Sequence, residues 1–144
     1  MSASAASNLP PSLIPPAAAH ARCCIVLVDG EHYPTAVFDA ISDLKAAGWD
    51  VVAAALVGGG EKLRGVPDYG VPHLPPPAGD PTPAGAMRAA LAMAGPGVGT
   101  VVDLADEPML VFERRLELVG IAAARSLRYV TADTIVEPPT FERV

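Results

Sequence analysis

The chain has 144 residues, of which 51% are apolar and 18% are charged, and its net charge is −6 at pH 7. This length and composition predict one folded domain with a buried core, and they exclude a disordered chain, which would be poorer in apolar residues. The negative charge also argues against binding of nucleic acid through a basic surface.

Residues 1–22 are rich in alanine, serine and proline. We expect a disordered or polyproline-like tail there, because this composition offers little apolar surface to bury. The segment lacks the basic start of a secretory signal, and prolines interrupt it. No apolar stretch of the chain reaches the roughly 18 residues that a membrane span needs. We therefore expect a cytoplasmic protein in which residues 23–144 form a single α/β domain.

Strands and helices are predicted to alternate along this domain. Five short apolar segments are predicted strands, at residues 23–28, 51–57, 71–74, 100–104 and 128–131. Three segments with apolar residues at helical spacing are predicted helices, at residues 35–47, 83–94 and 108–126. This alternation predicts a Rossmann-like three-layer sandwich with a five-stranded, mostly parallel sheet in the order 3-2-1-4-5.

Local signals fix several details of these elements. Thr82 is suited to cap the second helix, with Pro83 at its first position. We expect the inward stripes of the three helices to be Val37, Ile41 and Leu44; Met87, Leu91 and Ala94; and Phe112, Leu116 and Val119. Cys23 and Cys24 are adjacent on a strand, so we expect two core residues on opposite sheet faces and no disulfide between them.

Polar turns follow four of the predicted strands. They are Val28-Asp29-Gly30-Glu31-His32-Tyr33-Pro34, Gly58-Gly59-Gly60-Glu61-Lys62, Asp103-Leu104-Ala105-Asp106-Glu107-Pro108 and Thr131-Ala132-Asp133. The carboxyl ends of parallel strands meet at one edge of a sheet, where α/β proteins bind ligands, so we expect these turns to gather there. His73 is expected at the same edge, and one of Arg114 and Arg115 is expected to reach it.

Carboxylates that gather at one edge repel one another, at a cost of about 1–4 kcal/mol per pair at partly solvated sites. A divalent cation such as Mg²⁺ would offset this cost, because it takes carboxylate oxygens and water as ligands. The glycine turn would let a phosphate approach backbone amides. No metal ligand is assigned from the sequence.

The same residues also have structural interpretations, which stay open at this point. These are helix caps for Asp29 and Asp106, a solvated turn for Glu31, packing of His32 beside Tyr33, a tight turn for Gly58–Gly60, a surface pair for Glu61 and Lys62, and a structural role for His73.

Common catalytic and nucleotide-binding motifs are missing from the sequence. There is no nucleophile elbow and no zinc-type spacing of cysteine and histidine. The segment from Gly58 to Leu63 lacks both the first glycine and the hydroxyl residue of a P-loop, and Gly30 does not begin a dinucleotide-binding fingerprint.

The turns after the first, second and fourth predicted strands resemble the N-terminal domain of cyclic 2,3-diphosphoglycerate synthetases. Arg114-Arg115 and the closing Tyr129-Val130-Thr131-Ala132-Asp133 with Pro138-Pro139 resemble it too, so the resemblance covers about residues 23–144. It implies an ATP- and Mg²⁺-dependent ligase that closes a phosphoanhydride in 2,3-diphosphoglycerate, or a related synthetase that phosphorylates 2-phosphoglycerate. In such enzymes a P-loop domain follows, and we expect it to be absent from this chain.

On this resemblance the chain is expected to be a substrate-pocket or dimerisation domain that is inactive alone. Catalytic residues are not assigned. The expected substrate-binding residues are Asp29, Gly30, Glu31, His32, Tyr33, Gly58, Gly59, Glu61, Lys62, Asp103, Asp106, Glu107, Arg114 and Asp133. The expected partners are a phosphoglycerate-type small molecule and either a second copy of the chain or a P-loop domain. The alternatives are a non-catalytic module that binds a metabolite or dimerises, and a metal-dependent phosphohydrolase of receiver-like shape.

Overall fold

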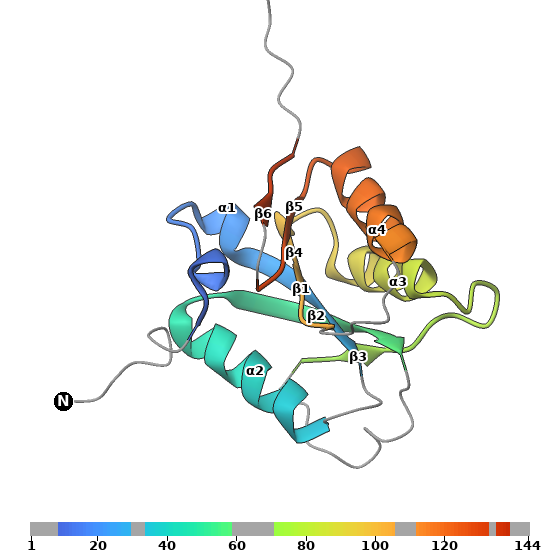
Figure 1. Ribbon diagram of the computed structural model, residues 1–144, viewed down its shortest axis with the longest axis horizontal. Coiled ribbons are helices and arrows are strands. Elements are labelled where there is room, and N and C mark those ends of the chain that lie inside the picture. The colour runs from blue at the N-terminus through green and yellow to red at the C-terminus, as the bar shows by residue number, and fades with distance from the viewer. Residues whose placement is uncertain (1–8, 30–33, 59–70, 106–111, 133–134, 139–144) are drawn as a thin grey trace, which may run out of the picture.

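The computed structural model describes residues 9–29, 34–58, 71–105, 112–132 and 135–138 (Figure 1). Its helices are the 3₁₀-helix η2 (Pro11–Leu13) and the α-helices α1 (Ala19–Arg22), α2 (Pro34–Ala47), α3 (Pro83–Ala94) and α4 (Phe112–Ala124). Its strands are β1 (Cys23–Asp29), β2 (Asp50–Gly58), β3 (His73–Leu74), β4 (Thr100–Asp103), β5 (Arg128–Val130) and β6 (Ile135–Val136). No helix in these ranges is both long enough and apolar enough to cross a membrane.

The strands form one mixed sheet in the order β3-β2-β1-β4-β5-β6. The first five strands of this order are parallel, which confirms the order predicted for them. The prediction of five strands is corrected by β6, which pairs antiparallel with β5. Two residues are too few to show an alternating pattern, so the sequence gives no signal for β6.

Helices cover both faces of the sheet. Helix α2 lies on one face, while α3 and α4 lie on the other (Figure 1). Ile25 and Leu27 of β1 point into the core under α3 and α4, whereas Val26 and Val28 point into the core over α2. The two cysteines follow the same alternation: Cys23 packs against the first core, Cys24 is buried in the second, and both are free thiols, as predicted.

Helix α3 begins as its sequence predicts. The hydroxyl of Thr82 accepts a hydrogen bond from the backbone N–H of Gly85 at 2.9 Å, and Pro83 is the first helical residue. Thr82 also donates to Oδ1 of Asp80 at 2.8 Å. The bond from Gly85 satisfies one of the free N–H groups that every helix start exposes.

The inward stripe predicted for α4 is wrong at Leu116, whereas Val119 is partly buried and packs against the core as predicted. Leu116 was expected to be buried, but 53% of its surface is exposed, while Leu118 and Ala122 are buried under the helix. The stripe therefore follows Arg115, Leu118 and Ala122, at spacings of three and four residues. Alanine and arginine carry weak signals of burial, so the leucine at position 116 misled the prediction.

Part of the segment expected to be a tail is folded onto the domain instead. Leu13 is only 5% exposed and packs in the core on the α2 face. Its carbonyl oxygen accepts a hydrogen bond from Nε1 of Trp49 at 2.6 Å. Ser12 donates to the carbonyl oxygens of Thr131 and Ala132, at 2.6 and 2.7 Å. Residues 9–22 differ from the expected tail because a few apolar and polar contacts with distant residues anchor them.

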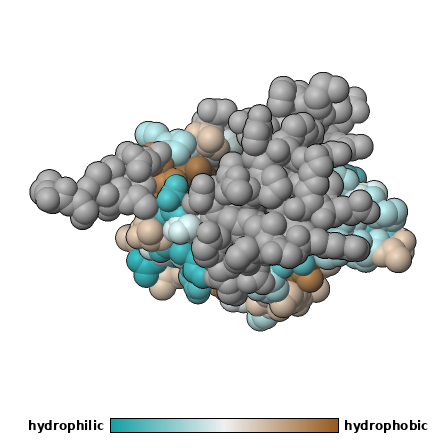
Figure 2. Space-filling view, turned by 90° about the horizontal axis from the view of Figure 1, so that it is seen from below, coloured by the Kyte–Doolittle hydropathy of each residue, from teal (hydrophilic) through white to brown (hydrophobic). Residues whose placement is uncertain are grey.

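Figure 2 shows the molecule from the side on which α2 lies. Among the described residues visible in that view, hydrophilic and hydrophobic surfaces alternate and do not merge into one broad apolar patch.

Candidate functional site

The candidate site is the edge of the sheet at which the parallel strands end. β1 ends at Asp29 and β2 ends at Gly58, and these two residues are register partners. On the other side of β1, β4 ends at Asp103, whose register partner is Leu27. Neighbouring strands lie about 5 Å apart, so the backbones of Asp29 and Gly58 lie side by side, and Asp103 lies beside β1 two residues before Asp29. Three of the predicted turns therefore start at one edge.

The other predicted site residues fall into two groups. Arg114 lies in the first turn of α4, and for Arg114, Asp29 and Gly58 the structure describes the backbone element alone. The following residues lie outside the described ranges: Gly30, Glu31, His32, Tyr33, Gly59, Glu61, Lys62, Asp106, Glu107 and Asp133. The role of all these residues in binding stays a prediction.

Asp103 is a buried carboxylate with several partners. Asp103 comes two residues after Val101 on β4, so its side chain points to the same face of the sheet, the one covered by α3 and α4. Oδ1 accepts the backbone N–H of Ala105 at 2.9 Å, which closes a short turn after β4. Oδ2 accepts the hydroxyl of Tyr129 and lies 3.5 Å from Nε of Arg115. Oδ1 therefore holds the turn after β4, while Oδ2 links Asp103 to β5 and α4.

Tyr129 comes from the middle of β5 and is almost completely buried. Burial raises the pKa of its phenol, and the adjacent negative charge of Asp103 and the hydrogen bond to it raise that pKa further. The positive charge of Arg115 opposes this rise in part. Tyr129 is consequently a neutral hydrogen-bond donor throughout the physiological pH range, and it acts as a fixed support for the carboxylate.

Arg115 connects α4 to this turn. Besides its ion pair with Asp103, it donates from one terminal nitrogen to the carbonyl oxygen of Ala105 at 3.3 Å. The predicted substrate-binding set contained Arg114 and omitted both Arg115 and Tyr129. The signal that would have selected Arg115 is its spacing of three and seven residues from Leu118 and Ala122, which places it on the inward stripe of α4.

His73 does not lie at this edge, contrary to the expectation. Its register partner on β2 is Ala54, four residues before the end of that strand. At about 3.3 Å per residue, this places it roughly 13 Å back along the sheet. Nδ1 of His73 lies 2.8 Å from the carbonyl oxygen of Val71. The geometry agrees with the structural interpretation of this histidine.

The fit of a metal ion can be judged only for the part of this edge that the structure describes. There, no three side chains among histidine, cysteine, aspartate and glutamate are grouped as metal ligands would be. The carboxylate of Asp103 already bonds through both oxygens to protein groups. Asp103 therefore fits the role of a positioning residue better than that of a metal ligand.

Comparison with known proteins gives one consistent result. The family profile described as "Cyclic 2,3-diphosphoglycerate synthetase, N-terminal domain" matches residues 23–137. A cyclic 2,3-diphosphoglycerate synthetase of Rubrobacter xylanophilus is 41% identical over 121 residues. Proteins of the same name from Thermococcus gammatolerans and Methanothermus fervidus are each 33% identical, over 129 and 126 residues.

These matches cover most of this chain and a minor part of each relative. The match to the Rubrobacter protein covers 83% of this chain and 26% of the relative, and the match to the Methanothermus protein covers 81% and 26%. The chain thus spans about a quarter of the length of the relatives that it matches. The segments at the candidate edge, which end β1, β2 and β4, all lie within the matched residues.

Proposed function

Because this chain belongs to the cyclic 2,3-diphosphoglycerate synthetase family through the N-terminal domain of those proteins, we propose that it forms the substrate-facing half of such a synthetase. In this proposal the edge at which β1, β2 and β4 end faces a phosphoglycerate-type substrate. The ATP-dependent step takes place between this edge and a P-loop domain. The chain alone binds substrate and does not turn it over.

The observation that carries the proposal is the convergence of three strand ends. Asp29 and Gly58 are register partners, and Asp103 ends the strand on the other side of β1. These residues are separated by 29 and 45 positions in the sequence, yet the parallel sheet brings their backbones to one edge. Ligands bind at this edge in α/β folds because strand ends and helix starts meet there.

We assign the residues different tasks at this edge. Asp29, Glu31 and His32 position substrate or metal, and Lys62 and Arg114 contribute positive charge against its phosphates. Asp103, supported by Tyr129 and Arg115, fixes the start of the turn that leads to Asp106 and Glu107. Bound Mg²⁺ would neutralise phosphate oxygens, which matters because phosphoryl transfer depends mainly on positioning and charge neutralisation.

The nucleotide is assigned to another polypeptide segment. The 144 residues contain no G-x-x-x-x-G-K-[ST] sequence, whose backbone amides and lysine would hold the phosphates of ATP. With a net charge of −6, the chain also suits a partner surface that is basic. We therefore propose that a P-loop domain docks against the candidate edge and completes the pocket.

A reconstitution experiment tests this proposal. The purified chain is mixed with a recombinant segment of the Rubrobacter relative from outside the matched 26%, together with ATP, MgCl₂ and 2,3-diphosphoglycerate, and cyclic product is followed by ³¹P NMR. We expect product in the mixture and none from either part alone. Asp29→Asn should lower the rate by about tenfold, or ~1.4 kcal/mol. Asp50→Asn is the matched control, because Asp50 starts β2 at the opposite edge of the sheet.

Isothermal titration calorimetry of the chain with 2,3-diphosphoglycerate, with and without MgCl₂, separates the proposal from its alternative. A non-catalytic metabolite-binding or dimerising module is favoured by one observation: the described carboxylate at this edge, Asp103, makes its bonds to the protein itself. Binding heat without product in the reconstituted mixture would support that module. The absence of both binding heat and product would rule out a substrate-facing role.

A further inference from the structure

A cavity of about 410 Å³ lies at the other end of the sheet, remote from the candidate edge. Its walls come from the segments that lead into three strands: His20 precedes β1, Val98 precedes β4 and Leu127 precedes β5. Because these strands are parallel, their starts share one edge and their ends share the opposite one. The cavity is therefore separate from Asp29 and Asp103, and it does not depend on the proposed function.

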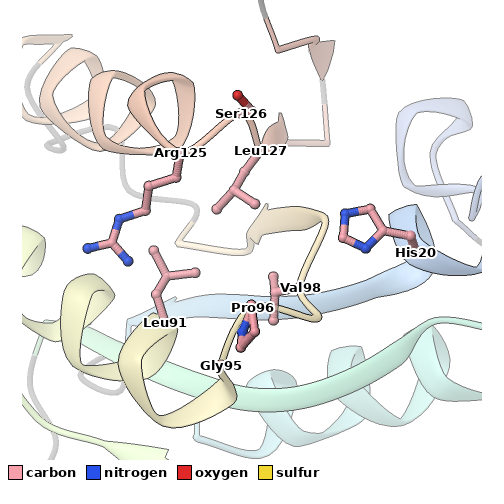
Figure 3. Close-up of a pocket in the computed structure, with 8 residues that line it drawn as sticks. All are labelled: His20, Leu91, Gly95, Pro96, Val98, Arg125, Ser126 and Leu127. Carbon is pink, nitrogen blue, oxygen red and sulfur yellow. The ribbon is translucent and has the colours of Figure 1, made fainter.

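The cavity combines an apolar interior with two nitrogen-bearing side chains. Leu91, Val98 and Leu127 are buried residues that form its apolar wall. The imidazole of His20 and the guanidinium of Arg125 lie on opposite sides of the cavity, with the apolar residues between them (Figure 3). None of the described residues that line the cavity is acidic. In a chain with a net charge of −6, such a place favours an anion locally.

The wall that carries His20 is held in place by close packing. The hydroxyl of Thr100 donates to the carbonyl oxygen of Ala21 at 2.6 Å, which fixes α1 to the start of β4. A Cβ atom at Gly99 would lie 2.5 Å from the carbonyl oxygen of His20, so this approach requires glycine. The backbone N–H of Arg128 donates to Gly99 at 3.0 Å. The segments around the cavity are thus joined to one another without a ligand.

The opposite wall is shaped by the end of α4. The backbone N–H of Leu127 donates to the carbonyl oxygen of Ala122 at 2.8 Å, and Ser126 adopts a positive φ of 58°. This turn sends Leu127 inward, while the hydroxyl of Ser126 points away from the other lining side chains (Figure 3). Arg125, the first residue after α4, is left on the rim with its guanidinium beside Leu91, on the side away from His20 (Figure 3).

We propose that this cavity binds a small organic anion, with its oxyanion head at Arg125 and a short apolar body against Leu91, Val98 and Leu127. The head is a carboxylate or a phosphate, because a guanidinium donates paired hydrogen bonds to both. The volume lies within the range of about 300–1,000 Å³ that small-molecule sites occupy. A fully inorganic anion would leave the apolar wall unused.

NMR titration of the ¹⁵N-labelled full chain tests this proposal with four probes. They are 4-methylvalerate, phenyl phosphate, the neutral isostere 4-methylvaleramide, and inorganic phosphate. We expect saturable shifts of the amides of Gly95, Val98 and Leu127 with at least one of the two organic anions. The organic anion that binds more tightly shows whether the site prefers a carboxylate or a phosphate head group. The neutral amide and inorganic phosphate should each bind about tenfold more weakly than that anion, since one lacks the charge and the other the apolar body.

Two variants complete the test. Arg125→Gln should weaken binding of the tighter anion by about tenfold, because it removes the charged donor. Arg88→Gln is the matched control: Arg88 is an exposed arginine on α3 that pairs with Asp80 outside the cavity, and its loss should leave binding unchanged. The proposal is overturned if neither organic anion gives saturable shifts, if the neutral amide binds equally well, or if Arg125→Gln binds as the unchanged chain does.

Discussion

The hydroxyl of Tyr129 donates a hydrogen bond to Oδ2 of Asp103, although the two residues are 26 positions apart and both are almost inaccessible to solvent. They lie on the neighbouring strands β4 and β5. The bond places a neutral donor beside a carboxylate whose other oxygen holds the turn after β4. The integrity of the candidate edge therefore depends on a pair that lies beneath it.

Replacement of Tyr129 by phenylalanine should lower the stability of the folded domain. The variant keeps the ring in the core but leaves Oδ2 of Asp103 without this donor in a buried position. Hydrogen bonds to charged groups contribute about 1.5–3 kcal/mol, so we expect Tyr129→Phe to lower the free energy of unfolding by that amount. Urea denaturation measures it. In an Asp103→Asn background the same change should cost clearly less, and an equal cost in both backgrounds would show that the two residues act independently.

Arg115 should contribute less than Tyr129 because it is partly exposed. Its ion pair with Asp103 spans 3.5 Å, and 39% of the arginine side chain is accessible. After allowance for screening by solvent, Arg115→Gln should cost about 1 kcal/mol in urea denaturation. Arg88→Gln breaks a pair in which both partners are exposed, and it should change stability by less than about 0.5 kcal/mol. If the two variants lose the same stability, Arg115 has no special role at this edge.

Alkaline pH should destabilise the domain through its buried acids. Burial raises the pKa of the Cys24 thiol, and the nearby Cys23 and Asp50 raise it further. Burial and Asp103 likewise raise the pKa of the Tyr129 phenol. Unfolded chains release these protons above about pH 8.5 for the thiol and 10 for the phenol, whereas the folded chain retains them. Stability is therefore complete below pH 8.5 and falls as pH rises, by about 1.4 kcal/mol per pH unit for each group.

Urea denaturation between pH 7 and 10.5 checks this expectation, with cysteine variants as the comparison. Cys24→Ala should flatten the decline between about pH 8.5 and 10, because it removes the buried thiol. Cys23→Ala should flatten it less, since Cys23 is only partly buried and its pKa is raised by weaker burial and by Asp50. A decline that is identical in all three proteins would show that these thiols do not control alkaline stability.

What the sequence could predict here depends on how local each signal is. The cap of α3 is local, since Thr82 and Pro83 act within one turn, and it was predicted correctly. The order of the parallel strands follows from the alternation of elements and the handedness of their connections, so it was predictable as well. The choice between Leu116 and Leu118 as the inward residue was not predictable, because α4 offers apolar residues on two stripes.

Contacts between distant residues set the remaining limits. Ser12 bonds to Thr131 across 119 positions, and no periodicity in an alanine- and proline-rich segment indicates such a partner. Similarly, the arginine that supports Asp103 is recognised only when the carboxylate is known to lie under α4. Of the candidate site, the convergence of Asp29, Gly58 and Asp103 was predictable from topology, whereas the support by Tyr129 and Arg115 required side-chain geometry.

Gly99 should tolerate no side chain, whereas its neighbour Gly97 should accept one. A Cβ atom at Gly99 would lie 2.5 Å from a backbone oxygen and 2.9 Å from Cδ2 of His20. Gly99→Ala should thus force α1 away from β4 and cost about 1–3 kcal/mol, the usual range for overpacking. A Cβ at Gly97 meets nothing within 4 Å, so Gly97→Ala should be neutral or stabilise by about 0.4–1 kcal/mol. Thermal unfolding followed by circular dichroism distinguishes the two, and equal stabilities would contradict the close approach of α1.

Leu13 should be the main anchor of the N-terminal segment, and Trp49 should report on it. Leu13 is 5% exposed and its carbonyl oxygen accepts the indole N–H of Trp49, the single tryptophan of the chain. Leu13→Ala should cost about 2 kcal/mol, at the low end for buried leucines because the segment lies at the periphery of the core. If the segment then detaches, water reaches Trp49 and its fluorescence emission shifts to longer wavelength.

The neighbouring Ile14 is 53% exposed, so Ile14→Ala should change stability by less than about 0.5 kcal/mol and leave the emission unchanged. An emission spectrum and stability of Leu13→Ala that match those of the unchanged chain would show that this segment is not held by Leu13.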